Sequence, residues 1–213
     1  MLLVVGLGNP GKEYANNRHN IGFVAVDEVV RHYSFSSFRS KFQGEIAHGN
    51  IGSAKVLALK PLTFMNEVGR SVQAVTDFYK IPLKNVIVIH DEIDLVGGKV
   101  RVKIGGGHAG HNGLRSIHDH VGADFVRVRI GVGHPGEKTE VAGHVLKDFA
   151  KSERIWVDRV INSVGEYIPM LVDGDYSTFM SKIAIVVSPP GATDTTLPEG
   201  SLGHGNELEK NSD

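Results

Sequence analysis

The feature that most constrains the fold of this sequence is the apolar run Val86-Ile-Val-Ile, which ends abruptly at the polar residues His90-Asp91-Glu92. A short, nearly continuous apolar run is typical of a strand buried on both faces in the middle of a sheet. Met1 to Val5 is a second run of this kind, and it stops at the turn sequence Gly6-Leu-Gly-Asn-Pro-Gly11. Because open α/β sheets bind ligands at the carboxyl ends of their strands, polar residues at these two ends are candidates for a site.

Strand patterns alternate with helical patterns along the chain. The expected strands span residues 1–5, 44–48, 54–60, 86–90, 99–104 and 125–130. The expected helices, with apolar residues three or four apart, span residues 21–33, 67–79, 114–121, 157–171 and 176–185. Residues 34–41 are expected to form a connector, and Gly49-Asn-Ile-Gly-Ser a turn between two strands. This alternation predicts a single-domain three-layer α/β/α sandwich with a twisted mixed sheet, over residues 1–187.

Composition limits the kinds of protein this can be. The 213 residues are 41% hydrophobic, enough for one substantial core. The sequence has no cysteine, which excludes thiol chemistry, and no segment resembling a membrane span or a secretion signal, so we expect a cytoplasmic protein without membrane contact. The net charge is −1, so a nucleic acid would have to bind a local basic patch. From Ser188 the chain turns to Pro, Gly, Ser, Thr and acidic residues, which predicts a disordered polar tail over residues 188–213.

Several polar side chains lie at strand ends or in loops, where chemistry is commonly placed. They are Asn9, His19, Asn66, Asp91, His111 and Asn112. A histidine paired with an aspartate can activate water, because the carboxylate fixes the imidazole tautomer and the free ring nitrogen accepts the proton. Asparagines can donate to a developing oxyanion or bind peptide groups. With no cysteine and no Gly-x-Ser-x-Gly elbow, this set of residues favours hydrolysis of an ester or amide without a covalent intermediate.

Some of these residues also have structural interpretations. Asn66 is well placed to cap a helix, Phe64 and Met65 to fill a core, and His90 and Glu92 to hold a loop. Gly6-x-Gly8-x-x-Gly11 matches a dinucleotide-binding fingerprint, but no helical period begins before Ile21, so the match is weak.

Histidines raise the possibility of a metal site. His108 and His111 lie three apart in the glycine-rich stretch Gly105–Asn112, and His90 and Asp91 are further candidate ligands. Because the sequence lacks a His-Glu-x-x-His helix or a comparable ligand pattern, we expect neither a metal nor another cofactor.

These motifs resemble those of the bacterial-type peptidyl-tRNA hydrolases, from residue 1 to about residue 185. The motifs are Val5–Gly11, Tyr14, Arg18-His19-Asn20, Phe64-Met65-Asn66, His90-Asp91-Glu92, Gly105–Gly113 and Arg129–Gly136. The resemblance implies a monomeric cytoplasmic enzyme that needs no cofactor and cleaves the ester between a peptide and its tRNA. It implies His19 as the general base, Asp91 as the group that stabilises it, and Asn9 as the residue that senses a blocked α-amino group. The tail from Ser188 matches nothing in the family pattern.

The resemblance also implies which residues hold the substrate. These are Tyr14, Phe64, Asn66 and Asn112, and we expect Met65 and His111 beside them to bind the substrate or the tRNA as well. Two rival functions remain at this point: a non-catalytic RNA-binding module, against which an intact His19–Asp91 pair argues, and a dinucleotide-binding protein.

A basic strand is the candidate contact for the tRNA backbone. Lys99, Arg101 and Lys103 alternate with apolar residues and share one face, and Arg129 lies in a second alternating strand. Alternate residues of a strand are about 6.6–7 Å apart, which suits successive phosphates. The alternative is a solvated edge strand, where lysine discourages aggregation. The glycine-rich stretch that follows favours tRNA binding, because it leads from the basic strand to the predicted ester site.

Overall fold

The computed structural model describes residues 1–187, so the predicted tail, 188–213, lies outside the described residues. The strands are β1 (Leu2–Gly6), β2 (Arg39–Lys41), β3 (Gly44–Ile51), β4 (Ala54–Pro61), β5 (Val86–Glu92), β6 (Val100–Ile104) and β7 (Val126–Gly131). The α-helices are α1 (Ile21–His32), α2 (Val68–Tyr79), α3 (Asn112–Val121), α4 (Val141–Val145), α5 (Arg154–Val172) and α6 (Tyr176–Val187). The 3₁₀ turns are η1 (Lys12–Tyr14), η2 (Arg18–Asn20), η3 (Met65–Glu67), η4 (Leu83–Asn85) and η5 (Lys138–Glu140).

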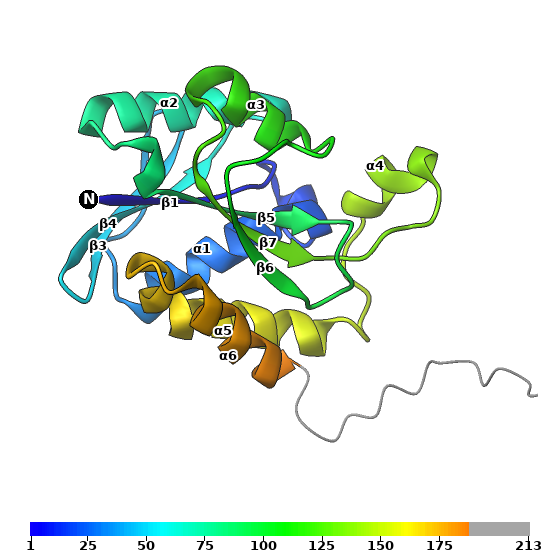
Figure 1. Ribbon diagram of the computed structural model, residues 1–213. Helices are drawn as coiled ribbons and strands as arrows, with labels where there is room; N and C mark the ends of the chain where they lie inside the picture. The colour runs from blue at the N-terminus through cyan, green and yellow to red at the C-terminus, as the bar shows by residue number, and fades with distance from the viewer. Residues whose placement is uncertain (188–213) are drawn as a thin grey trace, which may run out of the picture.

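One seven-stranded sheet in the order β2-β3-β4-β1-β5-β7-β6 forms the middle layer (Figure 1). The central strands β4, β1, β5 and β7 run parallel, whereas β2, β3 and β6 pair antiparallel with their neighbours. The predicted mixed sheet is therefore confirmed. The carboxyl ends of the four parallel strands lie at one edge of the sheet, which brings together the segments that follow them.

The two faces of the sheet carry separate apolar cores, and this makes the fold three-layered. Helices α1, α5 and α6 cover one face, and α2 and α3 cover the other (Figure 1). Strand β1 shows how the sequence serves both cores: Val4 packs with the first group of helices, whereas Leu3 and Val5 pack with the second. Successive side chains of a strand point to opposite faces, so a continuous apolar run fills both cores.

The structure differs from the sequence predictions mainly in short elements. Residues 39–41 form the edge strand β2, although the segment was expected to be a connector; the strand is short, polar and exposed, so it carries no alternation signal. Residues 49–51 belong to β3, which leaves only Gly52 and Ser53 in the turn. The five-residue helix α4 was not predicted, since it is too short to show a helical period.

Two predicted alternatives can be judged from the fold. Gly11 is followed only by the three-residue 3₁₀ turn η1, and the first α-helix begins at Ile21, so the described residues have no α-helix N-terminus where a dinucleotide pyrophosphate would need one. The structure therefore argues against dinucleotide binding. No helix within residues 1–187 is long and apolar enough to span a membrane.

Candidate active site

His19 reaches the end of β5 because glycines let the start of α1 lie directly on the sheet. A Cβ on Gly22 would lie 2.3 Å from the carbonyl oxygen of Ile89, and a Cβ on Gly6 would lie 2.2 Å from the carbonyl oxygen of Gly22. Any larger residue at either position would push the helix away. The close approach places the preceding turn η2, and with it His19, over the carboxyl end of β5.

His19 and Asp91 form a buried hydrogen-bonded pair. Nδ1 of His19 lies 2.8 Å from Oδ1 and 2.9 Å from Oδ2 of Asp91, and both residues are largely buried. Burial works to lower the pKa of His19, but the charge of Asp91 and its hydrogen bond together raise that pKa above the ordinary 6.5. With its Nδ1 proton directed at Asp91, His19 retains Nε2 as the nitrogen that can accept a proton.

His111 is a second partner of Asp91, and its hydrogen bonds fix its tautomer. Nδ1 of His111 accepts from the backbone N–H groups of Gly113 at 3.1 Å and Leu114 at 3.4 Å, which caps α3. The proton must then reside on Nε2, which donates to Oδ1 of Asp91 at 3.1 Å. Burial works to raise the pKa of Asp91, but the charges and hydrogen bonds of His19 and His111 hold it well below its usual value. Because both nitrogens of His111 are engaged, His19 is the one of the two histidines whose Nε2 is left to accept a proton.

Asn9 is held in one orientation by three hydrogen bonds. Its Oδ1 accepts from the backbone N–H of Met65 at 2.8 Å. The side chain of Asn20 accepts from the Asn9 N–H and donates to the Asn9 carbonyl oxygen, each at 2.9 Å. The side-chain oxygen of Asn9 therefore already accepts from a backbone N–H of the protein. Since Met65 engages that oxygen, the group Asn9 presents most freely is its Nδ2 donor.

A cleft of about 680 Å³ at the carboxyl edge of the sheet collects most of the predicted site residues. The predicted residues lining it are Asn9, Tyr14, His19, Phe64, Met65, Asn66, Asp91, His111 and Asn112. Phe64 is 59% exposed, so its interpretation as core filler is wrong, whereas Met65 is buried. Asn66 lies inside η3 and does not cap α2, whose N-cap residue is Glu67.

The far wall of the cleft comes from residues that sequence reasoning missed. They are His134, Lys138, Val141, Ala142, Val145 and Leu146, around η5 and α4. Arg18, next to His19, ties this wall to the body: its Nη1 donates to the carbonyl oxygen of Asp148 at 2.8 Å and its Nη2 pairs with Glu153 at 2.6 Å. Asn20 was likewise missed as a site residue; its place beside His19 in the Arg18-His19-Asn20 motif was the available signal.

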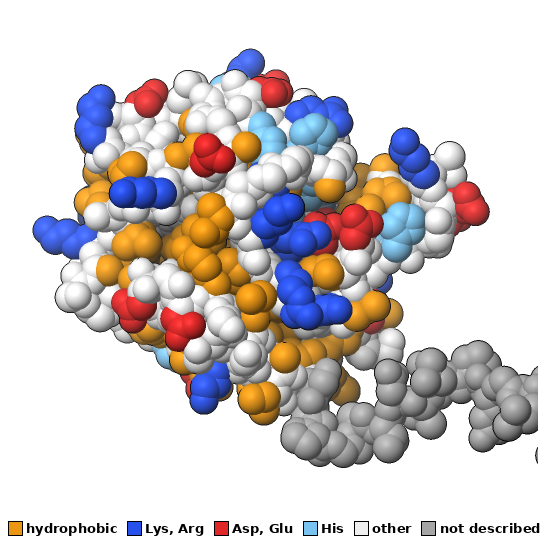
Figure 2. All heavy atoms as spheres, viewed as in Figure 1, with side chains coloured by type: hydrophobic (Ala, Val, Ile, Leu, Met, Phe, Trp, Pro, Cys, Tyr) orange, Lys and Arg blue, Asp and Glu red, His pale blue; other side chains and the backbone are white. Residues whose placement is uncertain are grey.

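The predicted phosphate-binding residues lie outside the cleft, and they differ in whether their charge is exposed or paired with a carboxylate. Arg101 and Lys103 are exposed on β6, at the edge of the sheet. Figure 2 shows Lys and Arg side chains gathered over this part of the molecule. Arg129 instead pairs with Glu92 at 2.9 Å, so part of its charge is neutralised.

The only group suited to metal binding within residues 1–187 is His19, Asp91 and His111, whose ligand atoms lie within 4.8 Å of one another. In the structure these atoms are joined by hydrogen bonds, so an ion would have to displace them. His90 does not join the group: its Nδ1 lies 2.6 Å from the Asp91 carbonyl oxygen, and burial above all lowers the pKa of His90 to about 3. His108 binds within its own loop, where its Nδ1 accepts from the Gly110 N–H.

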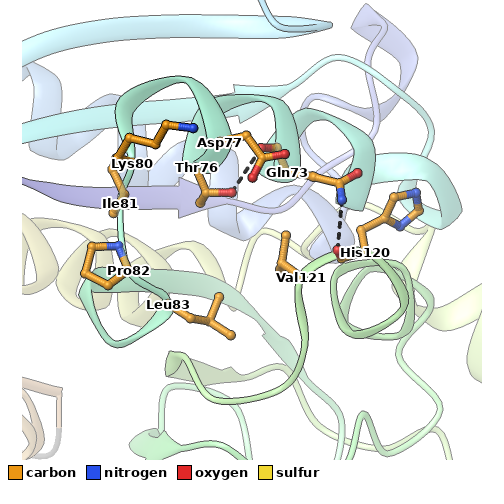
Figure 3. Close-up of a pocket in the computed structure, with 9 residues that line it drawn as sticks. All are labelled: Gln73, Thr76, Asp77, Lys80, Ile81, Pro82, Leu83, His120 and Val121. Atoms are coloured by element: carbon orange, nitrogen blue, oxygen red, sulfur yellow. Dashed lines mark hydrogen bonds between the residues drawn. The ribbon is translucent and has the colours of Figure 1, made fainter.

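A second hollow, of about 540 Å³, lies between the end of α2 and the end of α3 (Figure 3). None of the predicted site residues lines it. Its polar side chains serve the fold: Gln73 donates to the carbonyl oxygen of His120, and Thr76 donates to the carbonyl oxygen of Gln73. The catalytic candidates are thus confined to the cleft at the carboxyl edge of the sheet.

Comparison with known proteins points to one family. The model of the family described as peptidyl-tRNA hydrolase matches residues 3–190. A peptidyl-tRNA hydrolase of Rhodopseudomonas palustris (strain BisB18) is 56% identical over 194 residues, which are 91% of this chain and 96% of the relative. A relative of the same name from Ruegeria pomeroyi is 55% identical over 190 residues, covering 89% and 80%. The crystal structure of peptidyl-tRNA hydrolase from Acinetobacter baumannii has a TM-score of 0.80 and 41% identity, covering 86% of this chain and 94% of that one.

Proposed function

The chain belongs to the peptidyl-tRNA hydrolase family and hydrolyses peptidyl-tRNA, and we propose that Nε2 of His19 takes the proton from the attacking water. The observation that carries this proposal is the pairing of Nδ1 with Asp91, which leaves Nε2 as the free base. Water oxygen then bonds to the ester carbonyl carbon, and Asp91 stabilises the imidazolium that forms. When the bond between the carbonyl carbon and the ribose oxygen breaks, the imidazolium returns its proton to the leaving oxygen. The products are free tRNA and the carboxylic acid of the peptide, which then loses its proton to water.

Asparagines at the cleft supply the hydrogen bonds that the carbonyl oxygen needs as it gains charge. Nδ2 of Asn9 is a donor whose direction is fixed by Met65 and Asn20. Asn112 is exposed at the first turn of α3, where the helix N-terminus also favours negative charge. Donors held in place before the reaction stabilise an oxyanion at little reorganisation cost. We assign Asn9 and Asn112 to this role, and Asn9 also to recognition of the blocked amino group.

In this proposal the peptide and the last nucleotides of the tRNA bind along the cleft, next to the general base His19. Exposed Phe64 offers an apolar face for a side chain or a base, and Tyr14 and Asn66 offer polar groups beside it. Met65 also lines the cleft, although most of its side chain is buried. His111 lines the cleft, but its hydrogen bonds make it a support of Asp91 more than a direct contact of the substrate.

The acceptor stem of the tRNA follows the basic edge of the sheet. Arg101 and Lys103 are the exposed cations there, with Arg129 a weaker participant because Glu92 partly neutralises it. Residues 1–187 form the complete catalytic unit in this proposal, acting as a monomer in the cytoplasm without a cofactor.

The test is to incubate the protein with peptidyl-tRNA and measure free tRNA, with and without a metal chelator. Equal release in both conditions, lost in His19→Ala, is the expected result. Release that stops with chelator would instead assign the His19–Asp91–His111 group to a metal. Tight binding of tRNA with no release would favour the RNA-binding module.

A further inference from the structure

Arg127 is a buried cation that the proposed mechanism does not use. It lies in β7, is 3% exposed, and points to the face of the sheet covered by α2 and α3. Its Nη1 donates to the carbonyl oxygen of Gly107 at 2.6 Å, and its Nη2 donates to the carbonyl oxygen of Gly106 and to Nε2 of His118, the latter at 2.9 Å. None of the ion pairs found within residues 1–187 includes Arg127.

Holding a cation at this position is costly. The strand register places Lys103 directly opposite Arg127, and like charges that face each other across strands destabilise a sheet. Burial, and then the charge of Arg129, lower the pKa of Arg127. A buried ionic group is often replaceable by an apolar residue without loss of stability, so stability alone does not account for this arginine.

Two of the acceptors of Arg127, the carbonyl oxygens of Gly106 and Gly107, belong to the loop that enters the active site. We call residues 105–111 the glycine loop; it joins β6 to α3 (Figure 1). Gly105, Gly106, Ala109 and Gly110 all have positive φ, of 63°, 96°, 47° and 81°. A loop so rich in glycine has many accessible conformations, so its sequence alone does not select one. At its end, His111 must meet Asp91 at 3.1 Å.

The geometry of the guanidinium suits it to select that conformation. Its two terminal nitrogens hold the carbonyl oxygens of Gly106 and Gly107, which orients successive peptide groups of the glycine loop. Burial, and then the charge of Arg127, lower the pKa of His118, which keeps its Nε2 available as the third acceptor. A lysine at this position would offer one nitrogen and no planar fork.

We propose that Arg127 is a positioning residue of the active site, which fixes the glycine loop so that His111 supports Asp91 and Asn112 faces the substrate. This inference rests on the proposed roles of His19 and Asp91. It separates Arg127 from Arg101 and Lys103, because a phosphate of the tRNA has no access to a side chain that is 3% exposed.

The experiment compares Arg127→Met and Arg127→Lys with the wild type on two substrates: full peptidyl-tRNA, and an N-blocked aminoacyl ester of a single nucleotide. Arg159→Met is the matched control, since Arg159 is exposed on α5 over the opposite face of the sheet. Because a misplacement of about 1 Å can cost about 100-fold in rate, we expect kcat to fall about 10- to 100-fold on both substrates with a smaller change in KM. Lysine should not restore the rate, and the salt dependence of tRNA binding should stay as in the wild type.

His118→Phe is the second variant, for use if the arginine variants fail to fold. It removes one acceptor and keeps a ring against Phe125, so a smaller fall in kcat on both substrates is expected. A wild-type kcat on the nucleotide ester in folded Arg127 variants, or in His118→Phe where those do not fold, would overturn the inference. So would losses confined to full tRNA together with a flatter salt dependence, since these would make Arg127 a phosphate contact. Wild-type protein that releases no tRNA would instead overturn the proposed function, and this inference with it.

Discussion

Replacing Asp91 by asparagine tests the proposed base most sharply, because it changes charge and hydrogen bonding while barely changing size. Both carboxylate oxygens lie within 2.9 Å of Nδ1 of His19. Whichever way the new amide turns, its NH₂ group therefore faces that nitrogen. The NH₂ group of the new asparagine and the Nδ1–H of His19 would then be two donors facing each other. His19 would avoid this by moving its proton from Nδ1 to Nε2. In that tautomer Nε2 cannot accept a proton from water.

The expected loss follows from this change of tautomer. An aspartate-to-asparagine change that fixes the wrong tautomer in a histidine-based site costs roughly 10⁴ in rate, and loss of a general base roughly 10²–10⁴. We therefore expect kcat/KM of Asp91→Asn to fall by about 10²–10⁴, or about 3–5 kcal/mol in activation free energy. The substitution also removes the charge that raises the pKa of His19.

The dependence of rate on pH provides a second readout. Only neutral His19 can act as a base, so wild-type activity should rise with pH through a pKa above 6.5. In Asp91→Asn that acidic limb should move to lower pH, because the pKa of His19 is no longer raised. The assay is release of free tRNA from peptidyl-tRNA between about pH 5 and 9, with exposed Asp94→Asn as the isosteric control. Asp91→Asn with a wild-type rate and an unmoved acidic limb would refute the proposed mechanism.

Four further predictions follow from the site. His19→Ala should lower release of tRNA by about 10²–10⁴ while circular dichroism and melting stay near those of the wild type; a wild-type rate would remove His19 as the base. Asn9→Ala should narrow the ratio of cleavage between N-acetylated and free aminoacyl-tRNA, and an unchanged ratio would exclude Asn9 from that selection. A chain ending before Ser188 should retain its rate, because every described residue lining the cleft lies between positions 9 and 146, and its melting temperature, because residues 188–213 are polar and offer little apolar surface to bury; a large loss of either would contradict this. Replacing Arg101 and Lys103 by alanine should weaken tRNA binding and flatten its log–log salt slope by roughly 0.7–0.9 per lost contact, with little effect on a single-nucleotide ester; equal losses on both substrates would show that β6 supports the active site instead.

The pairing of His19 with Asp91 was predictable because it depends on where two buried strands end and where a helix begins, and sequence patterns indicate both. Apolar runs identified β1 and β5 as buried strands, and parallel strands present their carboxyl ends at one edge. The turn before α1 was visible from the start of the helical period at Ile21. The sequence pattern did not predict the backbone contact at Gly6 and Gly22, which sets how closely α1 approaches the sheet.

The α4 wall and the role of Asn20 were beyond sequence reasoning for a different reason. A five-residue helix has too few turns to show periodicity, and its place over the cleft depends on Arg18 meeting residues about 130 positions later. The side chain of Asn20 bonds to two backbone atoms of Asn9. Because every residue type has these backbone atoms, the sequence does not show which residue is the partner.

The cations of β6 and β7 show most clearly where a sequence pattern stops being informative. Alternation places Arg101 and Lys103 on one face of their strand and Arg127 and Arg129 on one face of theirs, and on that basis the four are equivalent. The register of β6 and β7 pairs them two by two, Arg101 with Arg129 and Lys103 with Arg127, so repulsion must be relieved from outside the pair. Glu92 of the neighbouring strand β5 relieves it at Arg129, and carbonyl oxygens of the glycine loop hold Arg127. An interior strand has neighbours on both sides that can supply partners, whereas an edge strand has only one. We therefore propose that the two exposed residues of β6, Arg101 and Lys103, are the ones left to bind phosphates.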